Sequence, residues 1–284
     1  MKHSIQSASD LCFCVVTPNY NMAGYLEETI QSVLCNLVPG DEYYVIDGGS
    51  TDGSVDIIRR YADRLSGWIS EPDRGYADAL SKGFAMSSAP LMCWINSGDL
   101  LLSGSLELRR EALASKGCDL IFADDFYIDE SGCILQHSNG RVKNLSAMML
   151  YGGWTPLQDA CSWKRALYEA SGGLNVHIPH AADFDMFLRM SHQGTASYLP
   201  ATLSAFRRHA EQKSVSGAGL YAAERNQLRK RMLEEVGRLA VLGWCRLAWY
   251  AVAVQLRARI SLLNQRRSRM IGTKIGQVKA CRHA

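Results

Sequence analysis

The sequence lacks the loops with which two large enzyme classes hold phosphate groups. Neither GxxxxGK[ST] nor GxGxxG occurs in its 284 residues, so it supports neither a P-loop kinase nor a dinucleotide-dependent dehydrogenase. A membrane-spanning run is also missing, because the nearly uncharged stretch 239–254 is shorter than the roughly 20 residues that cross a bilayer. A bound phosphate group would therefore need another kind of site.

Paired cysteines and a signal sequence are missing as well. The nine cysteines form no CxxC pair and lie mostly inside apolar runs, which is typical of small buried side chains in a reducing compartment. The chain begins with a polar segment, and the apolar run that follows, Leu11 to Val16, is too short for a signal peptide. We therefore expect a cytoplasmic protein whose residues 1–10 are disordered or loosely held.

Charge is divided unevenly along the chain. The formal net charge is only +3, but residues 1–224 carry 17 Lys and Arg against 26 Asp and Glu, whereas residues 225–284 carry 14 against 2. A hydrophobic fraction of 47% and a charged fraction of 21% exclude wholesale disorder. We expect an acidic globular domain with a sizeable core, and a basic extension that faces a different partner.

Short buried strands alternate with helices in the first part of the chain. Four predicted strands begin at Leu11, Glu42, Gly67 and Leu91, and each ends in a turn rich in Asp, Asn or Gly. This rhythm predicts an α/β fold with a mostly parallel sheet, whose strand ends form one binding crevice. Further along we predict a strand at 118–123, a hairpin at 124–136, a mobile loop with a short helix at 137–160, a strand at 160–163, helices at 164–170 and 182–192, and a strand pair over 196–206.

Four aspartates follow these strands and would meet at one edge of the sheet: Asp47, Asp52, Asp73 and Asp99. Gathered carboxylates repel one another unless they bind a cation or accept hydrogen bonds. A divalent ion with oxygen ligands would neutralise such a cluster and hold a diphosphate. For Asp52 a helix cap is the favoured interpretation, and for Asp99 a solvated turn former remains open from that stretch alone.

An ordered series of short polar motifs runs along residues 11–215. The series consists of Val15 to Asn21, Asp47 to Gly53, Ser70 to Gly75, Asp78-Ala79, Lys82-Gly83, Asn96 to Asp99, Gln158, Gly172 to Leu174, Ala182 to Asp185, Leu188-Arg189, and Arg207 to Ser214. Any one motif is weak, but the ordered set resembles the family 2 glycosyltransferases, in particular bacterial exopolysaccharide enzymes of the colanic-acid type. The resemblance implies a GT-A fold and inverting transfer of a sugar from a nucleoside-diphosphate donor to a glycan or lipid-linked acceptor in surface polysaccharide synthesis.

The resemblance also implies roles for individual residues. The predicted nucleotide site consists of Pro18, Tyr20, Asp47 and Asp73, which match positions that hold the base and ribose, together with Asn21, Arg74, Asp78 and Asn96. Asn96 to Asp99 matches the DxD-type motif, with Asp99 on a Mn²⁺ or Mg²⁺ ion, and His209 matches a histidine that approaches the metal and diphosphate. Three positions depart from the family pattern: Gly98 stands where many relatives have Asp, Ser81 where many have Asn, and Ala77 where a larger residue is common. The first departure leaves the metal with one certain carboxylate.

Asp183 matches the family's catalytic base. A sugar hydroxyl is a poor nucleophile, so inversion needs one positioned base opposite the leaving diphosphate. A carboxylate at a helix start is expected to stay ionised. Asp185 lies two residues further on and is interpreted as a first-turn acid that points elsewhere, while only the match to Arg207-x-His209 favours a site role for His209 over an ordinary satisfied histidine.

Two other functions remain open at this point. A nucleotidyltransferase also uses an open α/β sheet with acidic metal ligands, but it should carry a Gly-rich loop with Lys or Arg after the first strand, where this chain has Pro-Asn-Tyr-Asn. A catalytically inactive sugar-nucleotide-binding protein is the other alternative, and Gly98 favours it.

The basic extension, residues 216–284, is predicted to be helical and amphipathic. Its stretch 239–254 contains a single charge, Arg246, together with Trp244, Trp249 and Tyr250, and arginines flank it on both sides. Aromatic residues favour the headgroup level and basic flanks are drawn to anionic lipid. We expect a helix lying on the cytoplasmic face of a membrane, with packing on the catalytic domain or a second subunit as the alternative, and nucleic-acid binding is disfavoured.

Overall fold

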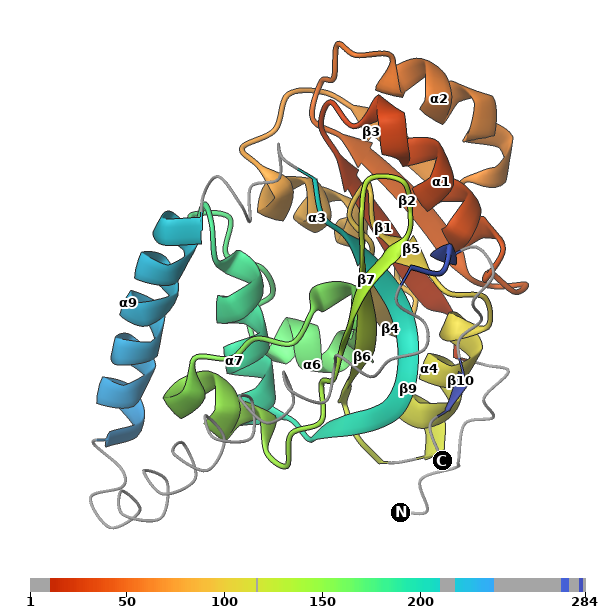
Figure 1. Cartoon of the computed structure of the whole chain (residues 1–284). Helices are drawn as coiled ribbons and strands as arrows, with labels where there is room; N and C mark the ends of the chain where they lie inside the picture. Colours follow the sequence, from red (N-terminus) through yellow and green to blue (C-terminus); the bar gives the residue numbers. More distant parts are fainter. Residues whose placement is uncertain (1–10, 116, 210–217, 238–271, 276–280, 283–284) are drawn as a thin grey trace.

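The computed structural model describes residues 11–115, 117–209, 218–237, 272–275 and 281–282 (Figure 1). Two predicted segments, the loose amino terminus at 1–10 and the apolar stretch 239–254, lie outside these residues.

Ten strands of the described ranges form one mixed sheet. Their order is β10-β9-β6-β8-β4-β1-β2-β3, with β5 paired to β9 and β7 paired to β6. The block β4-β1-β2-β3 is parallel, and β8 joins it antiparallel between β4 and β6. The strands are β1 Phe13–Asn19, β2 Glu42–Asp47, β3 Gly67–Ser70, β4 Leu91–Trp94, β5 Leu100–Leu101, β6 Leu120–Ile128, β7 Ile134–Ser138, β8 Cys161–Lys164, β9 Ala196–Arg207 and β10 Cys281–Arg282.

Helices cover both faces of this sheet. They are α1 Ala23–Leu34, α2 Ser54–Tyr61, η2 Ala62–Arg64, α3 Tyr76–Ala85, α4 Ser105–Ser115, α5 Leu145–Ala147, η3 Met148–Gly152, η4 Gln158–Ala160, α6 Arg165–Ala170, α7 Ala182–Gln193 and α9 Ala218–Gly237. The four predicted βα units at the start of the chain are present, and the α/β fold class is confirmed.

Alternation along β1 explains why the first strand is a continuous apolar run. Phe13 and Val15 belong to the core formed with α1, α2 and α4, whereas Cys14 and Val16 belong to the core formed with α3 and α7. Successive strand side chains point to opposite faces, so a strand covered on both faces has no polar side. Gly83 lets α3 approach closely, because an added Cβ would lie 2.5 Å from Val16 Cγ1.

The predicted strand pair over 196–206 is wrong, because β9 is one continuous strand. It runs parallel to β6, and its register shifts where Ala123 pairs with Leu199 and Asp124 with Thr202. Pro200 falls inside this irregularity. A proline has no N–H for the ladder, so the extra residues of a bulge let the strand continue past it.

The later part of the chain otherwise follows the prediction. The hairpin is formed by β6 and β7. β6 begins inside the strand predicted at 118–123 and continues to Ile128, into the predicted hairpin. The region 137–160 holds the short helix α5 and the single π-helical turn η3.

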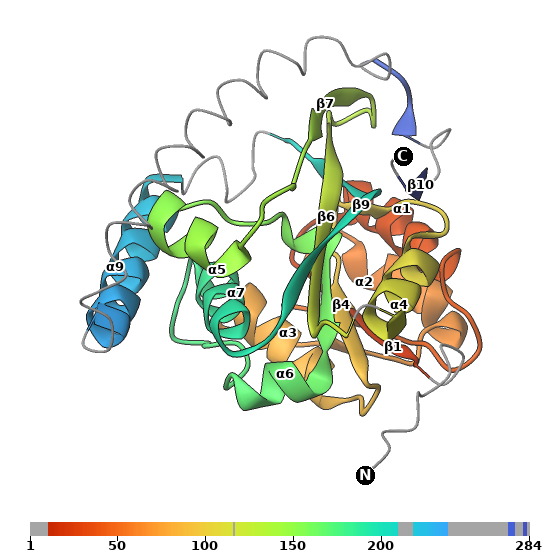
Figure 2. The same ribbon diagram turned by 90° about the horizontal axis from the view of Figure 1, so that it is seen from below.

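Part of the predicted basic extension is described as α9. This helix lies beside α7 and contacts η3 (Figures 1 and 2). Leu228 of α9 is buried, and Tyr221, Met232 and Leu233 pack against the same core as α7. Among the described residues, no helix is both long and apolar enough to cross a membrane.

Candidate active site

The predicted donor residues lie along one edge of the parallel block. Because β4, β1, β2 and β3 are neighbours in that order, the loops that follow them open side by side. The predicted residues at these strand ends are Tyr20 and Asn21, Asp47, Asp73, and Asn96 and Asp99.

Asp47, the last residue of β2, is a buried hydrogen-bond acceptor. Its Oδ1 accepts from the Asn19 amide at 2.6 Å and the Ser50 hydroxyl at 2.5 Å. Its Oδ2 accepts from the Ser70 hydroxyl at 2.7 Å and from the backbone N–H groups of Gly49 and Ser50. Burial alone would raise the pKa of Asp47, but these donors outweigh it, so the pKa is lowered and the group stays ionised. Asp47 therefore holds the loops after β1, β2 and β3 together.

Asp73 lies against the glycine that follows Asp47. A Cβ added at Gly48 would lie 2.6 Å from Asp73 Oδ2, so a larger residue there would displace the Asp73 carboxylate. The other oxygen, Oδ1, accepts a hydrogen bond from the Gly75 N–H at 2.7 Å. The carboxylate is thus fixed next to the end of β2, where the resemblance predicts contacts with the nucleotide.

The loop after β1 is built by reciprocal hydrogen bonds with the loop after β2. Asn21 has a left-handed backbone, with φ of +51°. Its N–H donates to the Ser50 hydroxyl, and its Oδ1 accepts from the Thr51 N–H. The neighbouring Tyr20 is 61% exposed, so its ring is available to a ligand. Pro18 is buried in β1, and its carbonyl accepts hydrogen bonds from the N–H and hydroxyl of Ser97.

Asp52 accepts hydrogen bonds at the starts of two helices, in agreement with its interpretation as a helix cap. Its Oδ1 accepts from the Ser54 N–H and hydroxyl at the start of α2, and its Oδ2 accepts from the Ala23 N–H at the start of α1.

Two predicted nucleotide-site residues pair with each other. The Arg74 guanidinium donates to Asp78 Oδ1 at 2.9 Å, and Lys82 lies 3.7 Å from Asp78 Oδ2. Arg74 is exposed, whereas Asp78 is largely covered. Any contact of Arg74 with a donor would therefore compete with this ion pair.

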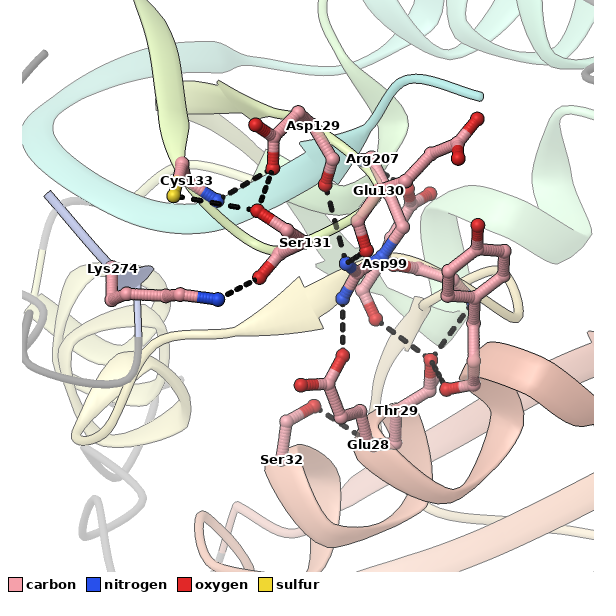
Figure 3. A network of polar contacts seen from close by, with 12 residues as sticks. Glu28, Thr29, Ser32, Asp99, Asp129, Glu130, Ser131, Cys133, Arg207 and Lys274 are labelled. Carbon is pink, nitrogen blue, oxygen red and sulfur yellow. Dashed lines mark hydrogen bonds and ion pairs between the residues drawn. The ribbon is translucent and has the colours of Figure 1, made fainter. Parts of the chain in front are cut away.

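Asp99, between the end of β4 and the start of β5, is held in a buried polar network (Figure 3). It is 3% exposed, and its Oδ1 accepts from the Arg207 N–H at 3.0 Å. Its Oδ2 has two long contacts of 3.4 Å, from the side-chain amides of Asn96 and Gln158. The Thr29 hydroxyl donates to the Asp99 carbonyl at 2.9 Å. The interpretation of Asp99 as a solvated turn residue is therefore wrong.

Gly98 adopts a conformation that explains its departure from the family pattern. Its φ is +107°, which strains any residue with a side chain, and an added Cβ would lie 3.4 Å from Met22 Cε. A second carboxylate at this position would require a different loop.

Arg207 ties the Asp99 loop to two other elements. Its guanidinium donates to the Gly98 carbonyl at 2.9 Å, to the carbonyls of the turn 129–130, and to the Glu28 carboxylate (Figure 3). Its guanidinium carbon also lies 4.9 Å from the centre of the Tyr25 ring. Because the side chain is 1% exposed, Arg207 acts as a buried clamp for the metal-type motif.

Two further aspartates lie beside Asp99 and were not predicted. Asp125 of β6 and Asp159 of η4 are buried, and their carboxyls interact with each other and with the Ser204 hydroxyl. Burial and the neighbouring Asp159 carboxyl raise the pKa of Asp99 well above its ordinary value, and burial raises the pKa of Asp159 to about 6. Three acids this close cannot all ionise in a medium of low polarity.

Asp99 could bind a divalent ion only in a site where most of the ligands are not protein side chains. Within the described ranges, no group of three or more His, Cys, Asp or Glu side chains is arranged to hold a metal. A Mg²⁺-type site needs one or two carboxylates with the remaining ligands from water and substrate phosphate. The weakly engaged Oδ2 of Asp99 suits that role. The ring of His209 lies 5.6 Å from that of Tyr25, which itself contacts Arg207.

Asp183, the predicted base, lies between two tyrosines at the start of α7. The Tyr76 hydroxyl is 3.4 Å from Asp183 Oδ1, and the Tyr221 hydroxyl is 3.4 Å from Oδ2. The Asp183 N–H donates to the Tyr76 hydroxyl oxygen at 3.1 Å. Burial raises the pKa of Asp183 to about 6, although the Phe184 N–H and both tyrosines oppose the shift. The expectation that the helix start keeps this carboxyl fully ionised is thus too simple.

The helix α9 supplies a residue that sequence reasoning missed. Tyr221 belongs to this helix, as does Glu224, whose carboxylate accepts from the N–H groups of His180 and Ala181 at 2.9 and 2.7 Å. These two backbone groups directly precede α7. One helix therefore contacts both Asp183, the predicted base, and the loop that leads into it.

Asp185 points elsewhere, as predicted. It pairs with Arg189 one turn along α7 at 2.6 Å. Arg189 also donates to the carbonyls of Ser171 and Gly173, so the pair anchors the preceding Gly-Gly turn.

Comparison with known proteins agrees with this geometry. The family model "Glycosyl transferase family 2" matches residues 14–146. A Bacillus subtilis protein named as a teichuronic acid biosynthesis glycosyltransferase, TuaG, is 31% identical over 111 residues, which are 38% of this chain and 44% of the relative. Hyaluronan synthase of Pasteurella multocida is 23% identical over 214 residues, 72% of this chain and 21% of the relative. The chain thus spans less than half the length of either relative.

The fold is shared with a solved glycosyltransferase. The mannosyltransferase PcManGT from Pyrobaculum calidifontis, in complex with GDP-Man and Mn²⁺, superposes with a TM-score of 0.54 at 17% identity over 86% of this chain and 80% of that one. The sheet is therefore of the predicted GT-A type. Residues 14–146 match the model of glycosyl transferase family 2, the family that the motifs of this sequence resemble.

Proposed function

We propose that the chain transfers a sugar, with inversion, from a nucleoside-diphosphate donor to a glycan or lipid-linked acceptor of surface polysaccharide synthesis. The observation that carries the proposal is the placement of Asp183. Its carboxyl lies at a helix start between the hydroxyls of Tyr76 and Tyr221, with its pKa raised to about 6. Such a group is ionised at neutral pH and still basic enough to accept a proton.

The proposed step uses Asp183 as the base. The acceptor hydroxyl oxygen bonds to the anomeric carbon of the donor sugar while the bond from that carbon to the diphosphate oxygen breaks. The hydroxyl proton passes to Asp183, and the nucleoside diphosphate leaves with the bonding electron pair. The two tyrosine hydroxyls hold the carboxylate in place.

The donor is assigned to the strand ends of the parallel block. There Asp73, Tyr20 and Asn21 surround the end of β2, and the ionised Asp47 fixes the loops. A Mn²⁺ or Mg²⁺ ion would be held by Asp99, with Asn96 beside it and His209 assigned by the family resemblance, and would supply charge neutralisation for the diphosphate. PcManGT, which binds GDP-Man and Mn²⁺, supports both assignments.

No structural observation favours the two alternatives over transfer. The loop after β1 has none of the basic residues that a nucleotidyltransferase loop would carry. Gly98, which favoured an inactive binding protein, is explained by the backbone of its loop.

The test is an assay of the purified full chain against a panel of sugar nucleotides. Release of UDP, GDP and dTDP is measured with Mn²⁺ or Mg²⁺, with and without EDTA. Metal-dependent release of one nucleoside diphosphate is expected. Binding of the nucleotides without any release would support the inactive binding protein, and release of pyrophosphate would support the nucleotidyltransferase.

Attachment to the cytoplasmic face of a membrane through residues 216–284 remains part of the proposal. Its apolar stretch 239–254 lies outside the described residues. Because α9 contacts Asp183, the matched truncation should end after Gly237 rather than near Ser214. Flotation with anionic liposomes should recover the full chain and leave that truncation behind, and equal recovery would contradict membrane attachment.

A further inference from the structure

Two arginines lie one turn apart on α9, next to the residue that contacts Asp183. Arg225 follows Tyr221 by four positions, and its guanidinium carbon lies 6.0 Å from the centre of the Tyr221 ring. Arg229 follows by another four positions. Residues spaced by four share a helix face, so both arginines lie on the side that Tyr221 turns toward the base.

Arg229 is anchored to the π-helical turn η3. It donates to the carbonyls of Leu150 and Tyr151, each at 2.9 Å. Gly153, which ends this turn with φ of +63°, gives it room, since an added Cβ would lie 2.9 Å from the Arg229 guanidinium. That same Cβ would lie 3.9 Å from Arg225. The two cations therefore converge on the turn at 152–153.

No acid compensates this pair within the described ranges. Neither arginine forms an ion pair there, and the buried Nε of Arg225 has no hydrogen-bond partner. The nearest acid on the helix, Glu224, is occupied by the N–H groups of His180 and Ala181. Burial and the neighbouring Arg225 lower the pKa of Arg229. Two half-buried cations without a counter-charge are costly unless an anion joins them.

We propose that Arg225 and Arg229 bind an anionic group of the acceptor, a phosphate or a carboxylate. The guanidinium group suits both, because its planar donors match two oxygens at once. The inference rests on the proposed function, in which Asp183 touches the acceptor hydroxyl. Arg225, one helical turn from Tyr221, is then within reach of the acceptor, while the donor occupies the strand ends of β1 to β4.

The test compares Arg225→Gln with Lys230→Gln in the full chain. Lys230 is exposed on the same helix, so its variant removes one charge away from the pair. Arg229 is left intact because it holds η3. Isothermal titration calorimetry uses three probes: inorganic phosphate, glucuronate, and neutral glucose. Saturating nucleoside diphosphate fills the donor site, and thermal unfolding confirms that both variants fold.

Binding of phosphate or glucuronate, but not glucose, is expected for wild type and Lys230→Gln. Arg225→Gln should bind the same probe about tenfold more weakly, because it loses a charged hydrogen-bond donor. The probe that binds identifies the anion as phosphate or carboxylate. No binding of either anion, or an equal loss in the two variants, would overturn the proposal.

A second measurement separates this inference from the proposed function. The ratio of kcat/KM for a sugar phosphate or uronic acid acceptor to that for its neutral counterpart should fall about tenfold in Arg225→Gln and stay unchanged in Lys230→Gln. Equal losses on charged and neutral acceptors would contradict an anion site. If no acceptor is glycosylated at all while the anion still binds through Arg225, the proposed function fails and the anion site stands.

Discussion

Asp47 and Asp183 are two covered carboxylates held in opposite ways. Burial raises the pKa of both, but Asp47 accepts short hydrogen bonds from side chains and peptide N–H groups, so its pKa ends below the ordinary value. Asp183 is opposed in its shift by the Phe184 N–H and by two tyrosine contacts of 3.4 Å, but burial outweighs them and its pKa rises to about 6. The strength of the hydrogen bonds relative to the cost of burial decides whether a carboxylate is a fixed acceptor or a group that can take a proton.

This contrast separates the two regions of the site. At the strand ends of β1 to β3, the Asp47 carboxylate accepts several hydrogen bonds and so fixes the loops that would receive the donor. At the start of α7, a carboxyl whose hydrogen bonds do not offset its burial can change its charge. The four predictions below test the contrast, from the largest expected effect to the smallest.

The largest effect is expected for Asp183→Asn. The variant keeps the shape of the side chain but cannot accept the proton, so transfer should fall by on the order of 10²-fold or more while the nucleotide still binds. Asp185→Asn is the matched control, because that acid pairs with Arg189 rather than facing the tyrosines. Rates of transfer and nucleotide affinity are measured together. Near-normal transfer by Asp183→Asn would move the base elsewhere.

The next effect is expected at Asp99, between the end of β4 and the start of β5. Asp99→Asn keeps an acceptor for the Arg207 N–H but removes the charge that a divalent ion would need, so donor turnover should fall by on the order of tenfold to 10²-fold. EDTA should have the same effect on wild type and little further effect on the variant. Full turnover by both the EDTA-treated wild type and the variant would rule out the metal role of Asp99.

Asp47→Asn should lower stability rather than chemistry. The amide loses charged hydrogen bonds and places an NH₂ group against donors, which should reduce the free energy of unfolding by about 2–4 kcal/mol in urea titrations. Because the pKa of Asp47 is lowered in the fold, this difference should be complete above its ordinary pKa and fade as the pH falls through the lowered value. A difference that grows in acid would contradict the assignment.

The smallest effect is expected for Tyr221→Phe. Its hydroxyl favours the ionised form of Asp183, so removing it should raise the pKa of that carboxyl. The acid limb of the pH–rate profile should move up by about one pH unit or less, with a few-fold loss of rate near pH 6. Tyr61→Phe, which loses a hydroxyl bonded to Glu27 far from α7, should leave the limb in place.

The elements that depend on local sequence pattern could be predicted from the sequence. The predicted strands include β1 to β4, and the turns at the ends of β2, β3 and β4 hold Asp47, Asp73 and Asp99. These positions follow from a strand, a turn and a helix that are adjacent in the chain. The left-handed loop residues, Asn21 and Gly98, fit the same local reasoning.

Partners that come from distant elements could not be predicted. Asp125 and Asp159 meet Asp99 only because η4 packs against both β4 and β6, and no motif marks them. Arg207 reaches Asp99 across 108 positions of sequence. Tyr221 lies beyond the predicted domain boundary at 215, a boundary that stays a prediction, although α9 contacts the proposed base.

The pH dependence of kcat/KM for transfer by the wild-type chain tests the central claim most directly. Asp183 must be ionised to accept a proton, so the rate should rise with pH, reach half its plateau at about pH 6, and fall nearly tenfold per unit below that. The profile of Asp183→Asn should lack this limb and lie far below it. A wild-type limb that Asp183→Asn retains, or a flat wild-type profile between pH 5 and 8, would contradict Asp183 as the base.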